Sequence, residues 1–165
     1  MFTAGILTIS DKGSRGERQD KSGVTIREII SRVDTRLLNY DIIPDEKEAI
    51  IEKLVRWADE DKLDVLFTTG GTGLTPRDVT PEATLSVVDR IVPGFAEAMR
   101  AESLKKTPMA MLSRAVVGTR GKCLIINLPG SPRAVRECLE VILPALPHAV
   151  ETLKGQTGEC GTVQD

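Results

Sequence analysis

The glycine-rich segment Gly70-Gly71-Thr72-Gly73 is the part of this sequence best suited to binding a ligand. Glycine adopts positive φ and lets the backbone approach a phosphate closely, so consecutive glycines can present unhindered N–H groups to an anion. The segment lacks the lysine of a P-loop and the spacing of a dinucleotide-binding fingerprint. Two interpretations stay open at this point: a binding loop for another anionic ligand, and a turn that only lets the chain leave a strand.

A second segment that could bind a phosphate is Gly130-Ser131-Pro132, where a strand end, a hydroxyl and the start of a helix come together. The backbone N–H groups at a helix N-terminus attract anions. Serine before proline is also common as a helix cap. Taken alone, this segment is better explained by capping.

Two aspartates follow expected strands and differ in how easily structure explains them. Asp45 precedes a helix and Glu48 follows three residues later, so a capping box accounts for both. Thr80 is the better N-cap for the next helix, which leaves Asp78 without an obvious structural task. Two such carboxylates could hold Mg²⁺, which binds one or two protein carboxylates together with substrate phosphates. Arg77 is either a phosphate ligand or a surface charge.

Other catalytic residue types are scarce in the sequence. The single histidine, His148, lies beside Pro147 in an expected turn far from these loops, which argues against a catalytic triad or a histidine metal site. The three cysteines have no C-x-x-C spacing, so neither a disulfide framework nor a zinc site is indicated, and buried or idle thiols are expected: Cys123, Cys138 and Cys160.

The composition is that of an ordinary globular domain. The 165 residues are 41% hydrophobic and 28% charged, enough for one core and too apolar for disorder. A net charge of -2 with interspersed signs, and only 3% aromatic residues, argue against nucleic acid as a partner. The first apolar run is too short for a membrane span and lacks the basic residues of a signal peptide. We therefore expect a cytoplasmic protein that does not bind membranes.

Short apolar runs alternate with helical periodicity, which is typical of an α/β fold. Strands are expected over residues 4–9, ending at 41–43, and over 65–68, and helices over 21–32, after 44–45, from Thr80, over 95–104, from Pro132 and in a short turn ending near Gly155. The runs 115–117 and 122–128 flank Gly118-Thr119-Arg120-Gly121, which predicts a hairpin and hence a mixed sheet. The polar loops follow the strands at their carboxyl ends, where open α/β sheets bind ligands.

Residues 68–84, TTGGTGLTPRDVTPEAT, closely resemble the signature of the Mog/MoaB family of molybdenum cofactor biosynthesis proteins. The resemblance covers most of the chain up to Gly155, and the Leu128–Pro132 element with Asn127 before it is more similar to the Mog branch than to the MoaB branch. The other segments that carry it are Leu7–Asp11, Gln19–Lys21, Ile43–Glu46, Pro93–Phe95, Leu112–Arg114 and Ile126–Pro132.

The resemblance implies a three-layer α/β sandwich with a mostly parallel mixed sheet flanked by helices. It implies one molybdopterin-binding domain over residues 1–155 and a homotrimer, whereas the polar residues 156–165 lie outside the resemblance and are expected to form a tail. It also implies catalytic roles for two aspartates, Asp45 and Asp78, which would bind Mg²⁺ as well. The binding positions that the family pattern implies are Ser10, Asp11, Gly70, Gly71, Thr72, Gly73, Thr80, Asn127, Pro129, Gly130 and Ser131.

The activity that the resemblance implies is Mg²⁺-dependent transfer of AMP from ATP to molybdopterin, with release of pyrophosphate. A phosphate oxygen of the pterin would attack the α-phosphorus of ATP, so the site must bring two anions together. The alternatives are a non-catalytic molybdopterin-binding or scaffold protein of the MoaB type and a molybdate-inserting enzyme. The absence of an additional domain argues against the last, and contact with a separate molybdenum-insertion enzyme is expected instead.

Overall fold

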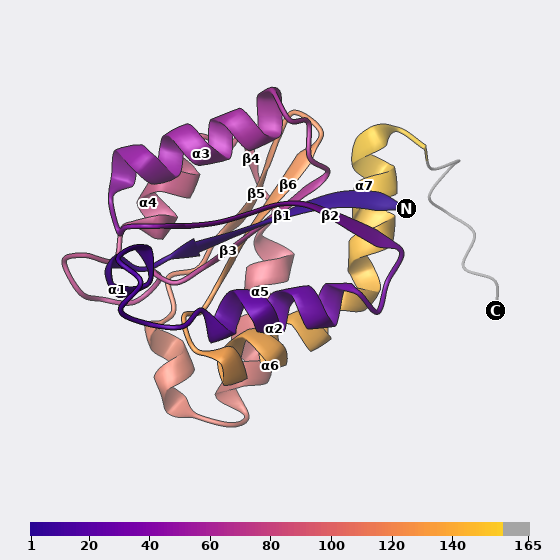
Figure 1. The fold of residues 1–165 in the computed structure, drawn as a ribbon. Coiled ribbons are helices and arrows are strands. Elements are labelled where there is room, and N and C mark those ends of the chain that lie inside the picture. Colours follow the sequence, from indigo (N-terminus) through magenta and orange to yellow (C-terminus); the bar gives the residue numbers. More distant parts are fainter. Residues whose placement is uncertain (157–165) are drawn as a thin grey trace.

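The computed structural model describes residues 1–156, which form one six-stranded sheet with helices on both faces (Figure 1). The elements in chain order are β1 Phe2–Ile9, α1 Asp11–Ser14, α2 Lys21–Ile30, β2 Thr35–Ile43, α3 Lys47–Asp59, β3 Val65–Thr69, α4 Thr80–Leu85, β4 Arg90–Ile91, α5 Pro93–Leu104, the 3-10 helix η1 Pro108–Leu112, β5 Val117–Arg120, β6 Cys123–Leu128, α6 Pro132–Ile142, the 3-10 helix η2 Leu143–Ala145 and α7 Leu146–Lys154.

The strand order is β2-β1-β3-β6-β5-β4. The pairs β1·β2, β1·β3 and β3·β6 are parallel, whereas β5 runs antiparallel to β6 and β4 runs antiparallel to β5. The prediction of a mostly parallel mixed sheet is therefore confirmed. Because four parallel strands are adjacent, their carboxyl ends all reach the same edge of the sheet.

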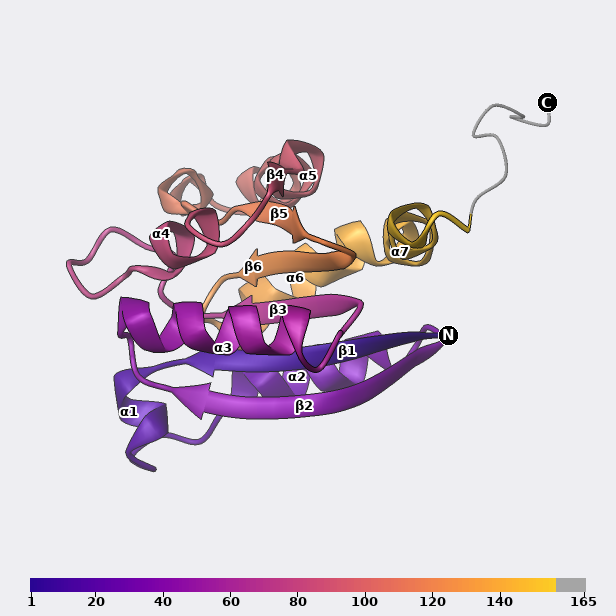
Figure 2. The same ribbon diagram turned by 90° about the horizontal axis from the view of Figure 1, so that it is seen from above.

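Two apolar layers form because successive side chains of a strand point to opposite faces of the sheet. In β1, Ile6 belongs to the core beneath α2, α5, α6 and α7, and the next residue, Leu7, belongs to the core beneath α3 and α4. Both side chains are fully buried. The two helix layers lie on opposite sides of the sheet, which confirms the three-layer arrangement (Figure 2).

Two helices begin differently from the prediction. The N-cap of α3 is Glu46, which forms no side-chain cap hydrogen bond, so the capping box of Asp45 and Glu48 is wrong. The N-cap of α4 is Val79, also without a side-chain cap bond, so the prediction that Thr80 caps this helix is wrong as well. In both cases tertiary contacts hold the polar side chain elsewhere.

Other differences concern short elements. The segment after β1, which was expected to be a loop, contains the four-residue helix α1, and the two-residue strand β4 had no sequence signal. The hairpin of β5 and β6 is confirmed, but Arg120 pairs with Cys123, so its turn lies at Gly121 and Lys122. Gly118 and Thr119 are strand residues. A Cβ at Gly118 would lie 2.8 Å from the Arg90 carbonyl oxygen. Glycine is therefore needed here because β4 approaches the backbone closely.

The cysteines within the described residues are buried free thiols, as expected. Burial raises the pKa of Cys123 to about 12 and also raises the pKa of Cys138, so neither is a thiolate nucleophile at neutral pH. Cys160 and nearly all of the predicted tail over 156–165 lie outside the described residues. Within residues 1–156, no helix combines the length and the apolar character that crossing a membrane requires.

Asn127 joins three elements inside the protein. Its side chain is fully buried, and its amide donates to the hydroxyls of Thr68 on β3 (3.0 Å) and Thr84 on α4 (2.9 Å). Its carbonyl oxygen accepts from the backbone N–H of Val116 at 3.3 Å. A buried polar group with all its partners in place stabilises one arrangement of the surrounding elements. Asn127 therefore anchors α4 to the centre of the sheet.

We predict that Asn127→Ala lowers the free energy of unfolding by about 3 kcal/mol, because it leaves buried donors and acceptors without partners. Urea denaturation of both proteins measures the difference. The control is Asn39→Ala, which removes the chain's other asparagine from the edge strand β2, where it donates to Asp61 at the surface. A loss for Asn127→Ala no larger than that of Asn39→Ala would contradict the anchoring role.

Candidate active site

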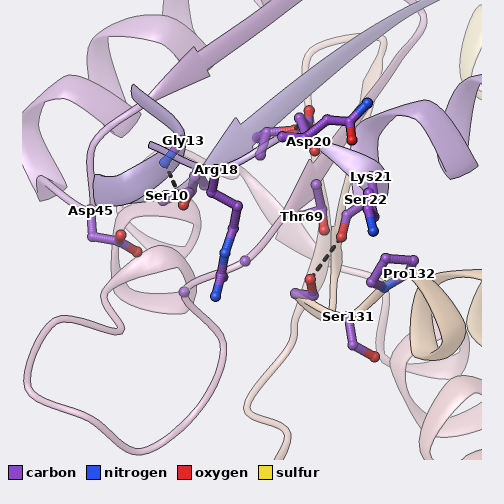
Figure 3. Close-up of a pocket in the computed structure, with 16 residues that line it drawn as sticks. Ser10, Gly13, Arg18, Asp20, Lys21, Ser22, Asp45, Thr69, Ser131 and Pro132 are labelled. Carbon is purple, nitrogen blue, oxygen red and sulfur yellow. Dashed lines mark hydrogen bonds between the residues drawn. The ribbon is translucent and has the colours of Figure 1, made fainter. Parts of the chain in front are cut away.

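A pocket with a volume of about 870 Å³ opens at the carboxyl ends of the parallel strands (Figure 3). Its walls come from the end of β1 with α1, from residues 18–22, from the end of β3 with the glycine turn, and from residues 130–132, together with Asp45. Small-molecule sites typically have volumes of about 300 to 1,000 Å³. The pocket is therefore large enough for a substrate with several phosphate or ring groups.

The glycine turn at the floor of the pocket requires glycine at two positions. Gly70 has a φ of 99° and Gly71 a φ of 65°, in the region that favours glycine. A Cβ at Gly70 would lie 2.3 Å from the carbonyl oxygen of Ile9, and a Cβ at Gly71 would lie 2.3 Å from Oγ1 of Thr80. Thr80 is buried, and its hydroxyl donates to the Gly70 carbonyl at 2.9 Å. The turn is thus both a structural necessity and part of the pocket surface.

The N-terminus of α2 forms the opposite wall and is held rigidly. Asp20 caps this helix by accepting from the Gly23 N–H at 2.9 Å, and it also accepts from the hydroxyls of Thr8 (2.6 Å) and Tyr40. Burial, together with the Asp20 carboxylate, raises the pKa of Tyr40, so the phenol stays a hydrogen-bond donor. Ser22 donates to the carbonyl of Gly130 at 2.7 Å and so ties α2 to the loop before α6.

Two cationic side chains, Arg18 and Lys21, line the pocket without an ion-pair partner among residues 1–156. In the close-up, Arg18 extends from the loop before α2 into the space between Asp45 and Thr69 (Figure 3). Cations without a carboxylate partner in a pocket are available to an anionic ligand. Neither residue was predicted from the sequence, although Gln19–Lys21 is one of the segments that carry the family resemblance.

A reciprocal pair of hydrogen bonds holds Asp45 at the edge of the pocket. The backbone N–H of Asp11 donates to Oδ2 of Asp45 at 2.8 Å, and the backbone N–H of Asp45 donates to Oδ1 of Asp11 at 3.1 Å. Arg77 binds both carboxylate oxygens of Asp11, at 2.8 and 3.1 Å, and also binds Glu46 at 2.9 Å. Arg77 therefore pairs with carboxylates of the protein itself. The sequence had suggested only a phosphate ligand or a surface charge.

The charges at this corner shift the two aspartates in opposite directions. The hydrogen bonds from the Arg77 guanidinium lower the pKa of Asp11, while burial raises the pKa of Asp45. The carboxylates of Asp11 and Asp78 raise the pKa of Asp45 further, although the N–H of Asp11 and the charge of Arg77 oppose them. An ionised Asp45 is thus disfavoured by its surroundings and gains from any cation that approaches it.

Asp78 has a structural task, contrary to the prediction. Its Oδ2 accepts from both the backbone N–H and the hydroxyl of Thr75 at 2.8 Å, and its own N–H donates to the Thr75 carbonyl at 3.0 Å. These bonds close the turn Thr75–Asp78. The side chain does not line the pocket, but its charge reaches Asp45.

The donor atoms near Asp45 suit a divalent cation that also binds phosphates. Oδ1 of Asp45 accepts no hydrogen bond from the described residues and lies beside the glycine turn, 3.3 Å from where a Cβ of Gly71 would be. Among residues 1–156, no group of three or more histidine, cysteine, aspartate or glutamate side chains could hold a metal ion. The protein therefore offers one or two carboxylates, a set that fits Mg²⁺ only when substrate oxygens complete its coordination.

The structure brings together about half of the predicted binding residues. Those that line the pocket are Ser10, Asp45, Gly70, Gly71, Gly130 and Ser131. Ser10 and Ser131 also cap α1 and α6, so the capping interpretation of Ser131 is confirmed alongside its place in the pocket. Five other predicted site residues do not line the pocket: Asp11, Thr72, Gly73, Asp78 and Pro129.

Thr80 and Asn127 are not available to a ligand in this structure. Both side chains are fully buried, and their hydrogen bonds hold the glycine turn and α4. The structure thus places these two predicted binding residues behind the pocket surface. Among residues that sequence reasoning missed, Thr69 lines the pocket and donates to the Pro129 carbonyl at 2.6 Å.

The fold and the pocket define a three-layer α/β protein with a pocket at the carboxyl ends of its parallel strands, whose lining includes two cationic side chains. Comparison with known families identifies residues 5–148 as a probable molybdopterin binding domain. Because that match spans most of the chain, the protein belongs to this family of molybdopterin-binding domains, the Mog/MoaB family of molybdenum cofactor biosynthesis.

Individual relatives agree with this assignment. The molybdopterin adenylyltransferase of Helicobacter pylori strain J99 is 46% identical over 153 residues, covering 92% of this chain and 87% of the relative. The solved structure of the molybdopterin biosynthesis enzyme MoaB from Thermus thermophilus is 53% identical with a TM-score of 0.90, covering 96% of this chain and 100% of the other. A MogA structure is 38% identical with a TM-score of 0.87, covering 92% and 99%. Identity is thus higher to this MoaB structure than to this MogA structure.

We predict that Asp45→Asn stabilises the protein at pH 7. The pKa of Asp45 is raised in the folded state, so the ionised carboxyl lowers stability once the pH exceeds its ordinary value of 3.8, and the penalty is complete above the raised value. The amide removes this charge and still accepts from the Asp11 N–H. Because the side chain is only half-buried, solvent screening limits the gain to the order of 0.5 kcal/mol.

Thermal unfolding of Asp45→Asn and the wild type across pH 3 to 8 measures this effect, and the difference should disappear below about pH 3.8, where both side chains are neutral. The control is Asp61→Asn at the surface, which should give no comparable gain in stability at pH 7. Destabilisation of Asp45→Asn at pH 7 would mean that the carboxylate is not strained in the folded protein.

Proposed function

We propose that this protein is a molybdopterin adenylyltransferase, which transfers AMP from ATP to molybdopterin in molybdenum cofactor biosynthesis and releases pyrophosphate. One observation carries the proposal: the pocket combines Arg18 and Lys21, two cations without ion-pair partners among the described residues, with Asp45, whose ionised form is disfavoured. Cations suit the phosphates of both substrates, and the carboxylate suits a metal ion that phosphates bring with them. The names of relatives that align over nearly the whole chain support the same activity.

Binding of the two anionic substrates is the first task of the site. Arg18 and Lys21 attract the phosphates, and the Gly70-Gly71 backbone lets them approach closely. The N-terminus of α6 beside Gly130 adds N–H groups and the positive end of its dipole. The bonds from Ser22 to Gly130 and from Thr69 to Pro129 hold these walls at a fixed separation, which favours a fixed alignment of the two substrates.

Direct transfer between the bound substrates is the chemistry that these residues support. The single histidine lies on α7 and does not line the pocket. Thr8 donates to Asp20, whose carboxylate also accepts from the Gly23 N–H and the Tyr40 hydroxyl. The lining hydroxyls of Ser22 and Thr69 donate to backbone carbonyls. The bonds of these three hydroxyls hold the pocket walls. The molybdopterin phosphate needs no base, since a phosphate monoester is largely ionised at pH 7; its oxygen bonds to the α-phosphorus as the bond to pyrophosphate breaks.

We propose that Asp45 and Asp78 hold Mg²⁺ together with the substrate phosphates. When bound, Mg²⁺ supplies charge neutralisation to phosphates that would otherwise repel the two carboxylates. Asp45 would be the direct ligand, because its Oδ1 accepts no hydrogen bond from the described residues. Asp78 would contribute its negative charge, which acts on Asp45 from outside the pocket.

We predict that Asp45→Asn and Asp78→Asn each lower the rate of AMP transfer by about 100-fold or more, because the first removes the proposed metal ligand and the second removes a negative charge that acts on it. Pyrophosphate release on incubation with molybdopterin, ATP and Mg²⁺, together with mass spectrometry of the pterin product, measures the rate. Asp61→Asn, which lies outside the pocket, is the control and should keep full activity.

Three outcomes separate the alternatives. Tight molybdopterin binding by the wild type without pyrophosphate would favour a non-catalytic binding or scaffold protein. Near-normal turnover of Asp78→Asn at saturating Mg²⁺ would remove Asp78 from catalysis. Molybdate-dependent release of AMP would indicate the insertion chemistry instead.

We also propose that the protein is a homotrimer, as the resemblance implies. Large apolar side chains are exposed along the end of α5 and η1, where they could pack against another copy: Leu104, Met109, Met111 and Leu112. Exposed apolar surface of this kind marks protein interfaces. Sedimentation equilibrium should give three times the chain mass, and Met111→Glu should shift the protein towards monomer. A monomeric wild type would contradict the proposal.

A further inference from the structure

Arg114 lies outside the pocket and forms hydrogen bonds with the loop between β3 and α4. This loop projects from the edge of the sheet (Figure 2). Its Nε donates to the carbonyl of Gly73 at 2.7 Å, and its Nη2 donates to the carbonyl of Asp78 at 2.7 Å. Its Nη1 binds the carboxylate of Glu82 on α4, and its backbone N–H donates to the carbonyl of Thr72 at 2.9 Å. One residue from a distant part of the chain thus holds both ends of residues 73–78.

Apart from the bonds of Arg77 to Asp11 and Glu46, the loop contributes little to fixing its own position. Its internal hydrogen bonds are confined to the turn between Thr75 and Asp78, and the Leu74, Pro76 and Arg77 side chains are exposed. No other described residue donates to the carbonyls of Gly73 and Asp78. Without the guanidinium, both ends of the loop would lose a bond that no other described residue replaces. The turn between them would then open more often, although Arg77 would still hold its tip to Asp11 and Glu46.

The guanidinium is suited to this task because its donors lie in one plane at fixed spacing, so it sets the separation between the two carbonyls. Glu82 sets its orientation, since the hydrogen bond from Arg114 lowers the pKa of Glu82 and keeps it ionised. The side chain of Arg114 is about one third exposed and does not belong to either apolar core. Its contacts are directed to the loop rather than to packing.

We infer that Arg114 is a positioning residue for adenylyl transfer. It fixes the backbone of Asp78, and thereby the carboxylate that acts with Asp45 across the glycine turn. The inference rests on the proposed function and on the proposed role of Asp78. Neither Arg114 nor residues 72–78 line the pocket, so its loss affects the chemical step more than substrate binding.

The test compares Arg114→Lys and Arg114→Gln with the wild-type protein. Arg114→Gln should lower kcat by about 10- to 100-fold with little change in KM for ATP, as expected when a reacting group is displaced by about 1 Å. Arg114→Lys should fall between the two, because an ammonium can reach one carbonyl but cannot span both. Hydrogen exchange at the amides of Thr75 and Asp78, which donate within the loop, should accelerate in the same order.

The matched control is Arg120→Gln. Arg120 has the same kind of contacts, with two bonds to the Asp59 carboxylate and one to the carbonyl of Val87, and a comparable side-chain exposure of 26% against 34%. It lies at the end of β5 that pairs with the start of β6, at the opposite end of the sheet from the pocket. Arg120→Gln should lower stability without lowering kcat.

Two results would overturn the inference: an unchanged kcat in Arg114→Gln, or a loss no greater than that of Arg120→Gln after correction for the folded fraction. If the wild type transfers no AMP, the proposed function fails separately. In that case, unchanged exchange at Thr75 and Asp78 would overturn the positioning of the loop, and faster exchange would support it.

Discussion

The pocket depends on how closely the backbone of Gly70 approaches the end of β1. The carbonyl oxygen of Ile9 occupies the space that any Cβ at position 70 would need, and the hydroxyl of Thr80 occupies the corresponding space at Gly71. This contact lets β3 turn sharply over the neighbouring strand while Thr80, the first residue of α4, holds the turn by its side chain. Asp45, Ser10 and the loop before α6 can surround one cavity only because the turn takes up so little room.

Charge is arranged across this cavity in a way that costs stability and suits anions. Arg18 and Lys21 stand on one side without partners among the described residues, while Asp45 on the other side is disfavoured in its ionised form by burial and by nearby carboxylates. Arg77 compensates part of this by binding Asp11 and Glu46. Active sites commonly retain such unfavourable charges, since the ligand supplies the missing counter-charges.

Rigid connections surround these charges. Asp20 accepts hydrogen bonds from Thr8, from Tyr40 and from the first turn of α2, and Ser22 links that helix to Gly130. On the other side, Asn127 anchors α4 and Arg114 holds the loop that carries Asp78. The polar residues of the family pattern thus divide into those that face the pocket and those that hold the facing residues in place.

The sequence by itself determined the alternation of strands and helices, the mixed sheet and the strand ends at which the pocket lies, because these follow from local periodicity and from the φ values that glycine allows. It also predicted site roles for Gly70, Gly71 and Asp45, which line the pocket. Only the tertiary structure decided what the neighbouring polar residues do. The local capping patterns at Asp45 and Thr80 were wrong because hydrogen bonds to Asp11 and to Gly70 compete for the same side chains. Arg18, Lys21 and Arg114 gained their roles through partners or surfaces far away in the chain, and no local pattern specifies which distant carbonyl or cavity a long cationic side chain will reach.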